Sequence, residues 1–185
     1  MNFLFNKYSH FNLANIVTFF NIASGIFAIY FLTHNQFFAA ALFAWLAGAF
    51  DIFDGKIARK YNLSTEFGIQ LDSYADFLSF VIVPAMFIYF AIFDGKEEFF
   101  NMALVAAAFI YYIISGLRRL IQFNLNAEEG EVEKYFTGVP TPLGAILLWA
   151  VYLVYLTGFV HEYFVLGMMV IIGFLLNSKV KIKHL

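Results

Sequence analysis

Long stretches without a charged residue are the feature that most restricts how this chain can fold. No Asp, Glu, Lys or Arg occurs between Lys7 and Asp51, and none occurs between Asp76 and Asp94. The 185 residues are 62% hydrophobic and 13% charged, with a mean hydropathy of +0.77. A soluble domain of this length cannot bury so much apolar surface, so the chain is predicted to lie in a bilayer.

The apolar runs predict an all-α integral membrane protein with six transmembrane helices and a short N-terminal interfacial helix. That interfacial helix is expected in residues 1–11, where Phe and Tyr alternate with Asn and Lys, and a disordered tail is the alternative. Pro84 is expected to bend the third span, and residues 124–139 are expected to form a loop. Residues 1–185 are interpreted as one membrane domain, with spans at 12–33, 36–58, 67–92, 99–122, 140–158 and 162–177.

The basic residues predict how these spans are oriented. Six spans put both termini on one side of the membrane, and ten of the eleven Lys and Arg residues fall on that side, whereas only Lys96 falls on the other. The positive-inside rule therefore predicts a cell (inner) membrane protein whose termini face the cytoplasm. No broad basic patch suggests a nucleic-acid partner, and the absence of cysteine excludes disulfides and thiol chemistry.

Four aspartates at the ends of two apolar runs form the candidate site: Asp51, Asp54, Asp72 and Asp76. Residues three or four apart share a helix face, and the short connection makes the two helices antiparallel neighbours, so their acidic faces can meet. Carboxylates are costly in hydrocarbon and repel one another when they are grouped. Mg²⁺ or Mn²⁺ would relieve that repulsion, and two such ions about 3.5–4 Å apart would suit this number of oxygen ligands.

The spacing around these aspartates resembles the signature of the CDP-alcohol phosphatidyltransferases, D-x2-D-G-x2-A-R-x8-G-x3-D-x3-D. A chance cluster of buried aspartates is the alternative, because any motif can match by accident. All eight fixed positions of the signature are nevertheless filled, by Asp51, Asp54, Gly55, Ala58, Arg59, Gly68, Asp72 and Asp76.

Three further segments resemble the phosphatidylserine synthase branch of that family: residues 72–85, 117–124 and 136–142. Gln122 departs from the branch pattern, which has a second arginine there. The resemblance covers residues 12–142 and implies transfer of a phosphatidyl group from CDP-diacylglycerol to L-serine, with release of phosphatidylserine and CMP. It also implies two divalent ions, Mg²⁺ or Mn²⁺, and a homodimer.

The resemblance assigns a role to each candidate residue. The four aspartates would hold the ions, and Asp76 would also accept the proton of the serine hydroxyl. The residues implied in CDP and phosphate binding are Gly55, Ala58, Arg59, Gly68, Thr65, Asn15 and Thr18. The residues implied in serine binding are Arg119, Arg118, Asn124 and Ser79.

Structural roles are the alternative for the polar candidates: helix capping, interhelical hydrogen bonds, a positive-inside anchor and bonding within one helix. Thr65 could cap a helix, and Arg118 could be a positive-inside anchor. Asn15 and Thr18, with Asn21 at the same spacing, could form interhelical hydrogen bonds. Ser79 could form a hydrogen bond within its own helix.

Four alternatives are weighed against phosphatidyl transfer from CDP-diacylglycerol to serine. A sibling enzyme acting on glycerol 3-phosphate or an inositol phosphate would need a denser basic cluster than Arg118 and Arg119 provide. An archaeal ether-lipid donor fits equally well, because no residue singled out here contacts the acyl chains. A divalent-cation transporter would explain the aspartates but not Gly55, Arg59 and Gly68, and a purely structural membrane protein would not tolerate unpaired carboxylates.

Overall fold

The computed structural model describes residues 3–95, 101–128, 135–178 and 181–183. This part of the chain is helical apart from two short strands, and its contacts divide it into two compact units, Met1–Ser79 and Phe80–Leu185. Within these described residues, four helices are long and apolar enough to cross a membrane, and two shorter apolar helices follow. The chain is a multi-pass, all-α integral membrane protein, as the sequence predicts.

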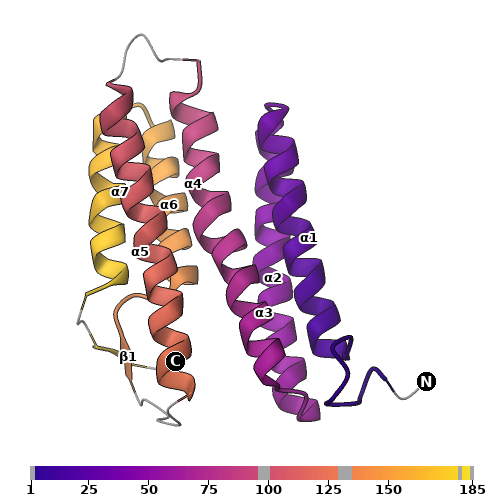
Figure 1. The fold of residues 1–185 in the computed structure, drawn as a ribbon. Helices are drawn as coiled ribbons and strands as arrows, with labels where there is room; N and C mark the ends of the chain where they lie inside the picture. Colours follow the sequence, from indigo (N-terminus) through magenta and orange to yellow (C-terminus); the bar gives the residue numbers. More distant parts are fainter. Residues whose placement is uncertain (1–2, 96–100, 129–134, 179–180, 184–185) are drawn as a thin grey trace. The chain divides into compact units, whose positions relative to one another are not determined.

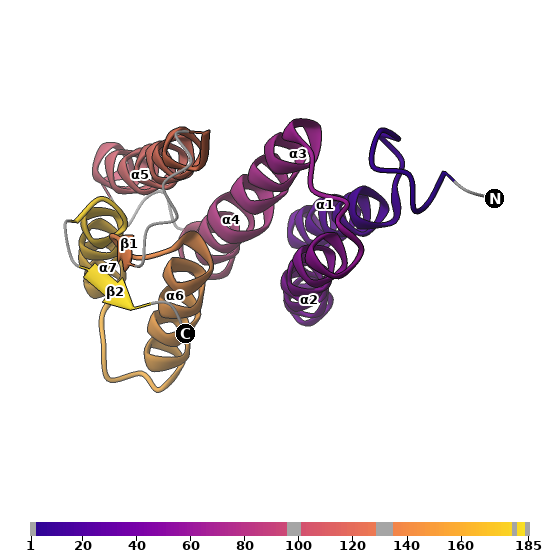
Figure 2. The same ribbon diagram turned by 90° about the horizontal axis from the view of Figure 1, so that it is seen from below.

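In the first unit, α1 (Leu13–Thr33) and α2 (Phe37–Tyr61) form a helical hairpin and lie side by side in Figures 1 and 2. The helix α1 begins where the Asn12 side chain accepts a hydrogen bond from the N–H of Asn15 at 3.0 Å, an N-cap that satisfies an exposed donor. Small residues allow two membrane helices to approach closely. Those buried in the hairpin are Gly25, Ala28, Ala40, Ala44 and Ala47.

A tight turn after α2 reverses the chain into α3 (Glu66–Asp76). Asn62 ends α2 in the left-handed region with a φ of 53°, which Asn adopts more readily than most residues. Thr65 caps α3, because its hydroxyl accepts a hydrogen bond from the N–H of Gly68 at 3.0 Å. The capping role weighed for Thr65 is therefore present, and α3 lies against α1.

The third span is one helical segment, Glu66–Phe93, with an irregular middle. After α3 it continues as a π-helical turn η1 (Phe77–Ile82), then α4 (Val83–Ile88), then a second π-helical turn η2 (Tyr89–Phe93). Pro84 lies in the first turn of α4, where a missing N–H does least damage to the helix. The irregularity expected at this proline takes the form of π-helical turns on both sides of α4.

The second unit contains α5 (Met102–Glu128), α6 (Thr141–Leu156) and α7 (Glu162–Leu176), together with α4. The helix α7 contacts both α5 and α6, and α4 contacts α6. A Cβ atom at Gly173 would lie 2.9 Å from Cε1 of Tyr111, so the glycine allows α5 and α7 to pack closely. The largest fully buried side chains of these three helices are Tyr112, Leu148, Met169, Ile172 and Leu176.

Two short strands, β1 (Tyr135–Thr137) and β2 (Lys181–Lys183), pair in an antiparallel manner, with Phe136 opposite Ile182. Gly138 follows β1 with a φ of 93°, and a Cβ atom there would lie 2.7 Å from the carbonyl oxygen of Leu176. Only glycine fits such a backbone conformation at such a close approach. The sequence predicts a loop and no strand in residues 135–137.

The predicted N-terminal interfacial helix is wrong for the described residues of that segment. Residues 3–11 form a series of turns. The Asn6 side chain accepts a hydrogen bond from the N–H of Tyr8 at 3.0 Å, and the Ser9 hydroxyl accepts one from the N–H of Phe11 at 3.2 Å. These local side-chain bonds satisfy backbone groups that a helix would otherwise pair.

The predicted loop at residues 124–139 is also wrong at both ends. The helix α5 continues to Glu128, and β1 occupies residues 135–137, whereas residues 129–134 lie outside the described residues. No glycine or proline occurs between Gly116 and Gly130, so the sequence contains no helix breaker near residue 122. The other expected helix bounds differ from the observed ones by at most three residues, although α6 and α7 have only 16 and 15 residues.

Candidate metal centre

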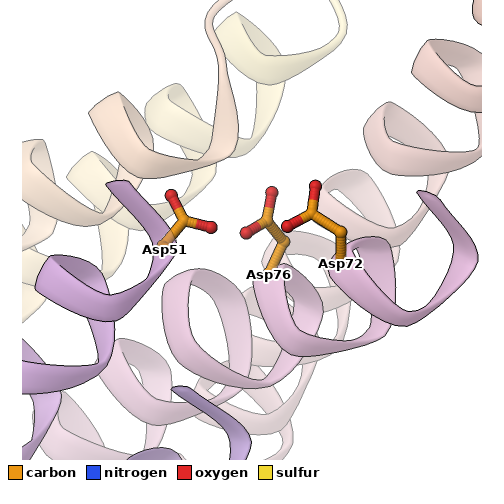
Figure 3. A group of neighbouring side chains, drawn as sticks. All are labelled: Asp51, Asp72 and Asp76. Atoms are coloured by element: carbon orange, nitrogen blue, oxygen red, sulfur yellow. The ribbon is translucent and has the colours of Figure 1, made fainter. Parts of the chain in front are cut away.

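Asp51 on α2 and Asp72 and Asp76 on α3 turn their carboxyl groups toward one another (Figure 3). One carboxylate oxygen from each residue lies within 4.8 Å of the other two. Asp72 and Asp76 share a face of α3 because they are four residues apart. The acidic faces of α2 and α3 therefore meet, as the spacing predicts.

The surroundings of this three-carboxylate group, Asp51, Asp72 and Asp76, fit a bound cation. Each of the three is partly buried, and the carboxyl groups of Asp51 and Asp76 lie close together. One oxygen of Asp76 is enclosed with no hydrogen-bond partner among the described residues. No described Lys or Arg forms an ion pair with the group. A divalent cation would relieve the repulsion among these grouped carboxylates, and hard oxygen ligands suit Mg²⁺ or Mn²⁺.

Asp54 lies beside the three-carboxylate group and faces α1. Its side chain is only 3% exposed, and one of its oxygens has no hydrogen-bond partner within the described part of the chain. Its carboxyl group lies close to the hydroxyl of Thr18 on α1. The four predicted aspartates therefore divide into a group of three and one buried neighbour.

Arg59 lies next to Gly55, one turn earlier on α2. A Cβ atom at position 55 would lie 3.6 Å from Nη1 of Arg59. Gly55 and Ala58 are half-buried, and Arg59 is exposed. The guanidinium is therefore accessible close to the aspartates, and its planar shape suits phosphate oxygens.

Three of the residues predicted to bind CDP meet where α3 begins. A Cβ atom at Gly68 would lie 3.0 Å from Oδ1 of Asn15 and 3.2 Å from Oγ1 of Thr65. Asn15 is buried, and its amide donates a hydrogen bond to the carbonyl of His10 at 3.0 Å. The absence of a side chain at Gly68 thus keeps the polar groups of Asn15 and Thr65 close together.

The predicted serine-binding residues of α5 belong to the second unit. Arg119 is buried, and its Nε donates a hydrogen bond to the carbonyl of Val139 at 3.3 Å. Arg118 is exposed and Asn124 is half-buried. This hydrogen bond links α5 to the segment that precedes α6, and it holds the Arg119 side chain in a defined position.

Two other candidate residues form hydrogen bonds within their own helices. The hydroxyl of Ser79 donates to the carbonyl of Ala75 at 2.7 Å, and that of Thr18 donates to the carbonyl of Ala14 at 3.2 Å. For Ser79 this is the structural bond weighed against a binding role, whereas the alternative weighed for Thr18 was a hydrogen bond between helices. Thr18 also lies within reach of Asp54, whereas Ser79 is buried near the end of the first unit.

Sequence reasoning assigned no site role to His10 or Asn21. The ring of His10 stacks on Phe67 with centroids 4.4 Å apart. Asn21 is fully buried in α1, and neither polar atom of its amide has a partner among the described residues. In the sequence, Asn21 is marked only by its spacing of three residues from Thr18.

His10 and Phe67 also line a hollow of about 650 Å³. Its other lining residues are Lys7, Tyr8, Ser64, Thr65, Glu66 and Ile69.

The fold and the site together define a class: a multi-pass membrane protein with an acidic, cation-compatible centre formed by α2 and α3. Residues 11–176 match the family model for CDP-alcohol phosphatidyltransferase. The chain belongs to the CDP-alcohol phosphatidyltransferase family, as its signature predicts.

Named relatives place the chain near the serine-specific members of this family. It is 28% identical over 172 residues to the CDP-diacylglycerol–serine O-phosphatidyltransferase of Helicobacter pylori (strain J99), covering 90% of this chain and 70% of the relative. The Bacillus subtilis (strain 168) protein of the same name is 30% identical over 133 residues, covering 72% and 71%. The archaetidylserine synthase of Methanothermobacter thermautotrophicus is 31% identical over 171 residues, covering 91% and 68%.

Proposed function

We propose that the protein transfers the phosphatidyl group of CDP-diacylglycerol to L-serine. The serine hydroxyl oxygen forms a bond to the lipid-linked phosphorus, the bond from that phosphorus to the CMP oxygen breaks, and the hydroxyl proton passes to a base. The products are phosphatidylserine and CMP. The three-carboxylate group within the family signature is the observation that carries this proposal, and the names of the bacterial relatives supply the acceptor.

Asp51, Asp72 and Asp76 would hold one divalent cation, and Asp54 would contribute to a second. Carboxylate oxygens and the lack of a basic partner within the described residues favour Mg²⁺ or Mn²⁺ over softer metals. When bound, such ions neutralise the pyrophosphate and the charge that develops at the transferred phosphorus.

Asp76 would accept the proton of the serine hydroxyl. A general base must come within hydrogen-bonding distance of that proton, and Asp76 retains an oxygen without a partner among the described residues. Arg59 would bind a phosphate oxygen beside Gly55, where no side chain intervenes. The CDP moiety would contact the polar cluster at the start of α3 and its neighbours, namely Asn15, Thr18, Ala58, Thr65 and Gly68.

Arg119 would bind the carboxylate of serine, and Arg118, Asn124 and Ser79 are proposed as further serine-binding residues. A guanidinium binds a carboxylate through two parallel hydrogen bonds when its position is fixed. The hydrogen bond from Arg119 to Val139 supports this role, because it orients a buried arginine.

We further propose that the whole chain acts as one domain, in a homodimer, in the cell (inner) membrane with the aspartates at the cytoplasmic face. The family match spans residues 11–176 and therefore extends over parts of both units. The charge distribution supports the orientation, and three of the basic residues counted for it lie outside the described residues: Lys96, Lys134 and Lys179.

An ether-lipid donor is the second candidate, and the similarity to an archaetidylserine synthase favours it. This alternative changes the donor lipid and leaves the serine acceptor unchanged. Family membership counts against the cation transporter, and the serine-specific names of the relatives count against glycerol 3-phosphate and inositol phosphate as acceptors.

A release assay tests the proposal. Purified protein in detergent is incubated with Mn²⁺ and CDP-diacylglycerol, or with the matching ether-linked CDP lipid, and with one acceptor at a time. CMP release with L-serine is expected, and release with glycerol 3-phosphate or inositol phosphate alone would reject serine as the acceptor. Faster release from the ether-linked donor would assign the chain to the second candidate.

A further inference from the structure

Asn21 is a buried polar residue that neither the fold nor the proposed reaction explains so far. It lies within the first membrane span with 0% of its side chain exposed. Neither Nδ2 nor Oδ1 has a hydrogen-bond partner among the described residues. An unpaired amide is especially unfavourable inside a membrane, so this side chain needs a partner in the working protein.

No hydrogen bond within α1 among the described residues satisfies the amide of Asn21. Ser24, one turn further along, donates its hydroxyl to the carbonyl of Phe20 at 2.8 Å, and Thr18, one turn earlier, donates to the carbonyl of Ala14. These hydroxyls are satisfied by their own helix, and the amide of Asn21 is not. The difference points to a group outside α1.

The packing of α1 against α2 indicates the level of the hairpin at which that group lies. Thr18 on α1 lies within reach of Asp54 on α2, and the rings of Phe20 and Phe50 stack with centroids 5.7 Å apart. In an antiparallel pair, moving three residues forward along one helix corresponds to moving about three back along the other. Asn21 therefore lies at the level of Asp51. Farther along the hairpin, small residues with the same three-residue spacing are buried on both helices, Gly25 and Ala28 on α1 and Ala44 and Ala47 on α2.

We infer that Asn21 is a positioning residue for Asp51. Its amide N–H would donate to the carboxylate of Asp51 when that carboxylate binds the divalent cation. Hydrogen bonds from outer residues orient metal-binding carboxylates and strengthen binding, and a neutral amide does so without opposing the cation. The inference rests on the proposed metal centre and adds to it a residue on α1.

The test compares Asn21→Leu with the wild-type protein, and Ser24→Ala serves as the matched control on the same helix. The dissociation constant of Mn²⁺ is measured by calorimetry on protein in detergent, and thermal unfolding is measured in EDTA. We expect Asn21→Leu to weaken Mn²⁺ binding about 10- to 100-fold. Its unfolding temperature in EDTA should stay equal or rise, because an unpaired polar group has been removed. Ser24→Ala should bind Mn²⁺ like the wild type.

The outcomes separate this inference from the proposed function. Wild-type Mn²⁺ affinity in Asn21→Leu would overturn the role of Asn21 and leave the metal centre intact, whereas a wild-type protein that binds no Mn²⁺ would overturn both. If Asn21→Leu does not yield folded protein, Asn21→Ala takes its place with the same expected loss of affinity. An unfolding temperature lowered in EDTA together with unchanged Mn²⁺ affinity would assign Asn21 to helix packing.

Discussion

The hydroxyl of Tyr112 donates a hydrogen bond to the carbonyl oxygen of Phe80 at 3.4 Å. Phe80 lies four residues before Pro84, which has no N–H to offer that carbonyl. Tyr112 is fully buried on α5, so its hydroxyl can replace the missing helical donor. A side chain of α5 thereby supports the π-helical turn η1 in the middle of the third span.

Replacing Tyr112 with Phe should therefore destabilise the protein. The loss of this buried hydrogen bond is expected to lower the free energy of unfolding by about 0.5–1.5 kcal/mol, measured as a lower unfolding temperature in detergent. Tyr111→Phe is the control, because Tyr111 is 39% exposed. Equal unfolding temperatures for the two variants would show that the Tyr112 hydroxyl contributes nothing.

Gly68→Ala should impair binding of the CDP-linked donor. The added methyl group would lie 3.0 Å from Oδ1 of Asn15 and 3.2 Å from Oγ1 of Thr65, so it would displace both. We expect the KM for CDP-diacylglycerol to rise about tenfold, equivalent to about 1.4 kcal/mol of binding. Gly167→Ala is the control, because a Cβ atom there meets nothing within 4 Å. An unchanged KM in Gly68→Ala would remove this cluster from the donor site.

Asp76→Asn should abolish turnover while leaving the protein folded. Loss of a general base typically costs about 10²- to 10⁴-fold in rate, and loss of a metal ligand adds to that effect. CMP release measures the rate, and the unfolding temperature verifies the fold. Asp94→Asn, an exposed aspartate outside the group, should keep the wild-type rate. Wild-type turnover in Asp76→Asn would exclude Asp76 as the base.

Gly138→Ala should destabilise the second unit. Position 138 has a φ of 93°, and the new methyl group would lie 2.7 Å and 2.9 Å from the carbonyl oxygens of Leu176 and Ser178. Gly158→Ala introduces the same kind of backbone strain at a φ of 76° with nothing within 4 Å. Backbone strain costs about 1–3 kcal/mol at either site, and the clash should make Gly138→Ala clearly worse. A smaller loss of thermal stability at position 138 would contradict the close approach.

Much of the fold and the core of the site could be predicted because both follow from local patterns. Runs without charge define membrane spans through the cost of placing a charge in lipid. The spacing of Asp72 and Asp76 places them on one face of α3, and the short turn after α2 is enough to bring Asp51 to them.

The sequence-based predictions are wrong or incomplete where the local structure depends on competition between hydrogen bonds, or on pairing between residues far apart in the chain. The turns around Asn6 and Ser9 replace a helix because two side chains bond nearby backbone N–H groups. The pairing of Phe136 with Ile182 joins segments far apart in the chain, and no local pattern encodes it. Asn21 escaped assignment because its spacing suited interhelical packing equally well, and only the structure shows that its amide has no partner among the described residues.

The number and affinity of the Mn²⁺ ions that the protein binds show whether the aspartates of α2 and α3 form a metal centre. Free Mn²⁺ is followed by electron paramagnetic resonance as it is titrated into wild type, Asp72→Asn and the control Asp94→Asn. We expect two saturable ions in the wild type and in Asp94→Asn, with clearly weaker binding in Asp72→Asn. Equal Mn²⁺ binding by all three proteins would show that the carboxylates of α2 and α3 do not form the metal centre.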